Sequence, residues 1–84
     1  MKLKKNYVVR KIGSEFFAVA ISSEKDQQMI KLNESAAFIF ERCLQDFTPD
    51  SLVEDLMHEY EISREIATRD VEAILLLMKE NGLL

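Results

Sequence analysis

Three helix-start signals set the organisation of this 84-residue chain. They stand at Asn33, at Thr48-Pro49-Asp50 and at Ser63. Asn, Thr and Ser side chains accept hydrogen bonds from the free amide groups of a first helical turn, and proline is favoured as the first helical residue. The sequence therefore predicts one helix over 34–46 with Leu44 on its inward stripe, and a second from residue 49 onward. It predicts a third helix over 64–81, ended by Gly82 in the left-handed conformation.

The residues before the first helix have a different pattern, because they are rich in β-branched and aromatic side chains. Two such runs, 7–12 and 15–21, are separated by a Gly-Ser pair, which indicates a hairpin. Residues 28–32 alternate polar and apolar, which predicts a short third strand with Ile30 and Leu32 toward the core. Three strands followed by three helices make an α+β fold, with a small antiparallel sheet at one end of a helical unit.

A length of 84 residues leaves room for one domain, over residues 1–84. Its 48% hydrophobic content is that of an ordinary soluble core. No apolar run approaches 18 residues, and the basic N-terminal segment lacks the apolar centre of a signal peptide. The single cysteine excludes an intramolecular disulfide. We therefore expect a cytoplasmic protein without a membrane segment.

The residues that catalysis requires are scarce. His58 is the only histidine and Cys43 the only cysteine, and no nucleophile motif surrounds either. We expect His58 to be a surface residue and Cys43 a small buried hydrophobic one. The paired acids lack a histidine at ligand spacing, and two glycines cannot form a phosphate-binding loop. The sequence therefore predicts no enzyme activity, no catalytic residue, no metal site and no cofactor.

Nucleic acid binding is the alternative function, because a small β-wing with three helices also describes a winged helix-turn-helix. In that fold the last helix would enter the major groove, where phosphates require a positive surface. The third helix instead carries four acids against three cations, namely Glu65, Asp70, Glu72 and Glu80 against Arg64, Arg69 and Lys79. Charge thus favours a partner other than nucleic acid.

The third helix has more apolar residues than one core-facing stripe can use. Ala67, Val71, Ile74, Leu75 and Met78 form the stripe expected to face the core. Ile66, Ala73 and Leu77, with Asp70 between them, form a second stripe rotated to one side. This second stripe could pack against the sheet or the first helix, bury itself in a homodimer, or bind another molecule.

The predicted third strand offers a binding partner for that stripe. In a simple meander it lies at the sheet edge, so its unpaired backbone groups could accept an extended peptide as a fourth strand. If the second stripe lies alongside, it would take alternate apolar side chains of the peptide, while Lys31 or Arg69 would meet acidic ones. The sequence thus suggests a peptide-binding groove.

Two segments resemble the PqqD-like family, named for the pyrroloquinoline quinone biosynthesis protein D. The run Ile30 to Phe40, IKLNESAAFIF, is similar to the family's LNETGAxIW signature, and the stretch from Ala67 to Leu84 is similar to ARxDVExxLxxLxxxGLL. The resemblance covers essentially the whole chain. Ala36 stands where the family commonly has glycine, and Phe40 replaces a frequent tryptophan.

The resemblance implies a winged helix-turn-helix-like fold and a non-catalytic adaptor that binds the leader segment of a ribosomally made precursor peptide. It implies that the leader adds antiparallel to strand three and packs against helix three. The implied partners are the leader peptide and a modifying enzyme, such as a radical SAM protein or a lasso-type leader peptidase. The predicted peptide-binding residues are Gln28, Met29, Ile30, Lys31, Leu32, Ile66, Arg69, Asp70, Ala73 and Leu77.

Overall fold

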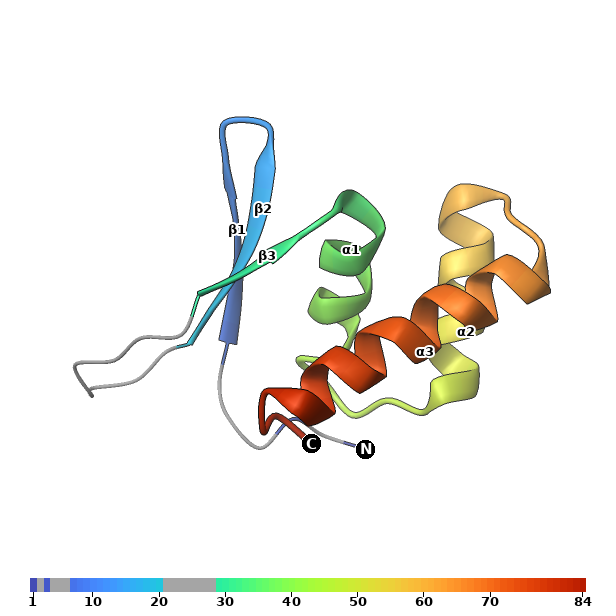
Figure 1. The fold of residues 1–84 in the computed structure, drawn as a ribbon. Coiled ribbons are helices and arrows are strands. Elements are labelled where there is room, and N and C mark those ends of the chain that lie inside the picture. The colour runs from blue at the N-terminus through green and yellow to red at the C-terminus, as the bar shows by residue number, and fades with distance from the viewer. Residues whose placement is uncertain (2, 4–6, 21–28) are drawn as a thin grey trace.

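A three-stranded sheet precedes three helices in the computed structural model, which describes residues 1, 3, 7–20 and 29–84 (Figure 1). The elements are β1 (Tyr7–Ile12), β2 (Glu15–Ala20), β3 (Met29–Leu32), α1 (Glu34–Arg42), α2 (Pro49–Tyr60) and α3 (Arg64–Glu80). The predicted α+β fold is confirmed. The predicted ends of strands two and three at Ile21 and Gln28 lie outside the described residues.

The sheet is an antiparallel meander in the order β1-β2-β3. Gly13, with a φ of 63°, lies in the turn between β1 and β2, where its missing Cβ permits the left-handed conformation. In the second pairing Phe16 lies opposite Leu32, and Ala18 opposite Ile30. Among the described residues β3 pairs with β2 alone, so the predicted free edge of strand three is confirmed.

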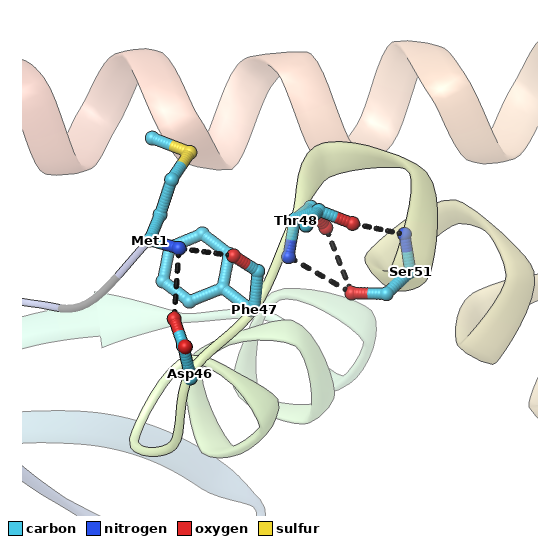
Figure 2. A network of polar contacts seen from close by, with 5 residues as sticks. All are labelled: Met1, Asp46, Phe47, Thr48 and Ser51. Atoms are coloured by element: carbon cyan, nitrogen blue, oxygen red, sulfur yellow. Dashed lines mark hydrogen bonds and ion pairs between the residues drawn. The ribbon is translucent and has the colours of Figure 1, made fainter.

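All three predicted helix starts are confirmed by their capping bonds. The Asn33 side chain accepts a hydrogen bond from the Ala36 amide, at 2.8 Å. Thr48 and Ser51 exchange side-chain and backbone bonds of 3.0 Å in a reciprocal capping box (Figure 2). Ser63 caps α3 through the Ile66 amide. Three short polar side chains thus determine where the helices begin.

The first helix is shorter than predicted, and one of its residues faces the other way. It ends at Arg42 rather than Asp46, because the Leu44 amide donates to the Glu41 carbonyl three residues back, at 3.2 Å, and the chain then turns. Leu44, expected to face inward, is consequently 45% exposed. The third helix ends at Glu80, one residue before the predicted end.

The segment after α1 is held by the first residue of the chain. The Met1 ammonium donates to the Asp46 carboxylate at 2.9 Å and to the Phe47 carbonyl (Figure 2). The Phe47 amide donates back to the Met1 carbonyl at 2.9 Å. Phe47 is buried, so these bonds anchor the α1–α2 connection beside the core.

The core lies where α1 meets the sheet and the other two helices. α1 packs against the sheet on one side and against α2 and α3 on the other (Figure 1). Its Phe40 is fully buried and meets the Tyr7 ring edge-on, with the centroids 5.9 Å apart. At the chain's far end Gly82, with a φ of 74°, turns Leu83 back into the interior, where it is 0% exposed. Leu83 therefore adds to the buried core beside the end of α3.

Candidate peptide-binding surface

The two faces of β3 differ in how far the rest of the protein covers them. Leu32 is buried and Ile30 half-buried, as the alternation predicts. Met29 is 57% exposed, and the Lys31 ammonium lies 3.0 Å from the Glu15 carboxylate on the outer face of the sheet. Lys31 is therefore paired across the sheet in an exposed ion pair, and its role in binding an acidic side chain stays a prediction.

The second apolar stripe of α3 is only partly covered by the rest of the protein. Ile66 is 46% exposed and Ala73 is also exposed, whereas Ala67 and Val71 on the core side are buried. Leu77 is half-buried and packs against the core. The alternative that the stripe simply packs inside the fold therefore applies to Leu77 and not to Ile66 or Ala73.

A pocket of about 80 Å³ joins the start of α1 to the second stripe of α3. On the α3 side the pocket is lined by Asp70, Ala73 and Ile74. On the other side it is lined by residues that follow β3 in the chain, namely Asn33, Ser35, Ala36 and Ile39. The Asn33 amide oxygen, which caps α1, also accepts a bond from the Ser35 hydroxyl at 3.1 Å, so the rim is held in place.

The structure brings together only part of the predicted residue set. Asp70 and Ala73 share the pocket, while Ile66 and Arg69 lie outside its lining. Arg69 is exposed, with its guanidinium 4.0 Å from the Glu65 carboxylate one helical turn away. Gln28 lies outside the described residues. The prediction missed the contribution of the first turn of α1, which the position of Asn33 directly after strand three could have indicated.

A backbone gap separates β3 from α3. Across the described residues of both elements, no Cα atom of α3 lies within 8 Å of a Cα atom of β3. α3 instead packs on α1 and α2, and α1 connects it to the sheet. The free strand edge and the exposed stripe are thus parts of two separate elements that flank the start of α1.

The structure places Cys43 in the interior and His58 at the surface. Burial raises the pKa of the Cys43 thiol from 9.0 to about 12, against a smaller lowering by the Met1 ammonium. Such a thiol stays protonated and unreactive near neutral pH. His58 is exposed, and no group of His, Cys, Asp and Glu among the described residues could hold a metal ion. No helix in the described part of the chain is long and apolar enough to cross a membrane.

Comparison with known proteins identifies the family. The model of the family "Coenzyme PQQ synthesis protein D (PqqD)" matches residues 18–84. The chain belongs to the PqqD family. The family match spans β3, the start of α1 and all of α3. A search of curated protein sequences gave no significant match.

Two solved structures share the fold of this PqqD-family protein. One is described as "Lasso peptide synthetase B1 complexed with the leader peptide"; it is 29% identical, with a TM-score of 0.70, and the match covers 98% of this chain and 93% of that one. The other, "TbiB1 in Complex with the TbiA(beta) Leader Peptide", is 20% identical, with a TM-score of 0.74 and coverages of 100% and 94%. Both similar proteins were thus solved with leader peptides.

Proposed function

We propose that this PqqD-family protein is a non-catalytic adaptor that binds the leader segment of a ribosomally made precursor peptide. The observation that carries the proposal is that the free edge of β3 leads into the start of α1, which shares a pocket with an incompletely covered stripe of α3. The fold shared with lasso peptide synthetase B1, which was solved with a leader peptide, supports it. The leader pairs antiparallel with β3 and lies against α3.

Strand pairing explains how such a surface binds many sequences yet prefers some. A strand added to β3 lies about 4.8 Å from it and is bound mainly by backbone hydrogen bonds, which do not depend on side chains. Alternate side chains of the peptide then point toward the helices. They meet the stripe formed by Ile66, Asp70, Ala73 and Leu77, while the others lie beside Met29 and Lys31 on the outer face.

The half-buried Asp70 distinguishes this stripe from a purely apolar one. It lines the 80 Å³ pocket, and no ion pair to it is found among the described residues. A peptide side chain entering the pocket would therefore meet the Asp70 carboxylate and the Asn33 and Ser35 side chains at the rim. The surface suits a leader with an apolar side chain that carries a hydrogen-bond donor at its tip.

An adaptor acts by binding the leader peptide and does not react with it. A protein that binds the leader and also contacts a modifying enzyme raises the local concentration of the substrate at that enzyme. The partner we propose is a modifying enzyme, such as a radical SAM protein or a lasso-type leader peptidase. The adaptor supplies no reacting group, in keeping with the protonated Cys43 thiol and the exposed His58.

The test is a titration of isotope-labelled protein with the leader of a precursor peptide encoded beside it. Backbone amide shifts should concentrate in residues 29–36 and 66–77. Absence of binding, or shifts restricted to α2 and β1, would refute the proposed surface.

Matched α3 variants sharpen that test. Ala73→Arg places a large charged side chain at the pocket and should weaken leader binding by about tenfold or more. Glu72→Arg is the control, because Glu72 is exposed, does not line the pocket and lies about 100° around α3 from Ala73. Both variants should keep their helical circular dichroism. Equal affinity of the two would place the leader elsewhere.

A further inference from the structure

A second pocket, of about 180 Å³, lies on a different side of α1. It is lined by Phe16 of β2, by Glu34, Ala37, Phe38 and Glu41 of α1, and by Tyr60 at the end of α2. The four α1 residues are spaced by three and four positions, so they form one helical stripe. None of them lines the pocket beside Asp70, so the two pockets use different faces of the same helix.

Three aromatic rings form the walls of this second pocket. The Phe38 and Tyr60 rings meet edge-on, with centroids 5.8 Å apart and planes at 85°, and the ring of Phe16 is half-buried. An aromatic ring attracts cations to its face, and the attraction strengthens when the cation is removed from water. The walls are therefore suited to a cationic group.

Two of the protein's own cations already lie over two of these rings. The Lys11 ammonium lies 5.7 Å from the centroid of Phe16, and the Arg42 guanidinium carbon lies 5.0 Å from that of Phe38. Neither Lys11 nor Arg42 lines the pocket. Phe16 and Phe38 are thus rings that already attract cations, and the cations that they contact are not part of the pocket lining.

Two carboxylates complete the pocket. Glu34 and Glu41 are exposed, and neither forms an ion pair within the described part of the chain. Burial, together with the negative charges of Glu34 and Glu59, raises the pKa of the Tyr60 phenol, which places the Glu34 charge close to that ring. Aromatic faces beside unpaired carboxylates have the chemistry that recognises guanidinium and ammonium groups.

We propose that this pocket binds an arginine or lysine side chain presented by a partner protein. The charge of the surrounding surface supports a basic partner, because residues 33–84 contain twelve acids against four Lys and Arg residues. An arginine fits best, since its planar guanidinium can stack on Phe38 while donating to Glu34 or Glu41.

The position of the pocket allows both partners to bind at once. A leader strand occupies the Asp70 side of α1, and the cation pocket opens on the side of Phe38. That the basic partner is the enzyme receiving the leader rests on the proposed function, whereas the pocket itself does not. The protein would then join peptide and enzyme through two faces of one helix.

The experiment uses N-acetyl-arginine methylamide as the probe and N-acetyl-citrulline methylamide, its uncharged analogue, as the control. The arginine probe should shift the amide and ring signals of Phe38, Glu41 and Tyr60, and citrulline should bind about tenfold more weakly or not at all. Equal shifts from both probes, or none from arginine, would overturn the cation site.

Charge-matched double variants complete the test. Glu34→Gln with Glu41→Gln should weaken arginine binding by about tenfold, and Glu72→Gln with Glu80→Gln, which removes two charges on α3, should leave it within about twofold. Equal losses of arginine affinity in the two variants would mean that net charge alone governs the binding, and this would overturn the site. A failed leader titration with intact arginine binding would refute the proposed function and not the pocket.

Discussion

The two sides of α3 have similar apolar residues but different surroundings. On the core side Ala67, Val71 and Met78 are at most 1% exposed, packed against the rest of the helical unit. On the other side Ile66 is 46% exposed and Ala73 is open beside a small pocket. The comparison shows that helical periodicity reveals how many apolar faces a helix has, whereas the packing of its neighbours decides which face is left for a partner.

The largest expected effect is on the core side. Met78→Ala removes a side chain with 0% exposure and should lower the free energy of unfolding by about 3 kcal/mol. Urea unfolding followed by circular dichroism measures the loss. A change below about 1 kcal/mol would mean that the interior collapses around the cavity and that the two sides of α3 are less distinct than the exposures indicate.

A pH dependence provides a second test of the covered interior. The pKa of Cys43 is raised to about 12 in the folded protein, so between pH 9 and pH 12 the folded state holds a proton that the unfolded state has lost. Stability is therefore full below pH 9 and falls as pH rises, by about 1 kcal/mol between pH 9 and 10.

This alkaline loss can be separated from other titrations. Burial also raises the pKa values of Tyr7 and Tyr60, but a tyrosine in the unfolded chain ionises near its ordinary pKa of 10.0, so their effect falls mainly above pH 10. Unfolding measured at pH 8, 9 and 10 should show the slope in the native protein and lose it in Cys43→Ala. A slope that persists in the variant would contradict a buried thiol as its source.

The smallest expected effect is on the open side. Leu76→Ala truncates a side chain that is 56% exposed and should change the free energy of unfolding by less than about 0.5 kcal/mol. Measured beside Met78→Ala, it gives the contrast between two positions only two residues apart. A loss approaching that of Met78→Ala would indicate that Leu76 is covered in solution, for example in a homodimer, and light scattering would detect the larger mass.

The order of the elements and the free strand edge could be predicted from the sequence, because they depend on local signals. Asn33, Thr48 and Ser63 cap the helices as expected, and Gly82 has the predicted left-handed conformation. Leu44 was misplaced because helical spacing assumes that the helix continues, whereas α1 ends at Arg42 and the chain turns.

The candidate site was less predictable, because it depends on distances between elements. Periodicity correctly separated Ala73 from the core residues but could not show that Leu77 packs inward or that Asn33 and Ser35 form the opposite rim. The aromatic pocket combines Phe16, Phe38 and Tyr60 from three elements with no shared motif. Only the packing of α1 between the sheet and α2 brings these rings together.

The four-residue length of β3 has a consequence for the protein before it meets a peptide. An open strand edge is a template for self-association, and natural proteins limit this hazard with short edges and charged side chains. Four residues span only about 13 Å, and one of them is Lys31. Such an edge offers a second copy few backbone bonds, which limits self-association without removing it, and a bound leader would cover the edge. Peptide loading should therefore also protect the protein against aggregation at high concentration.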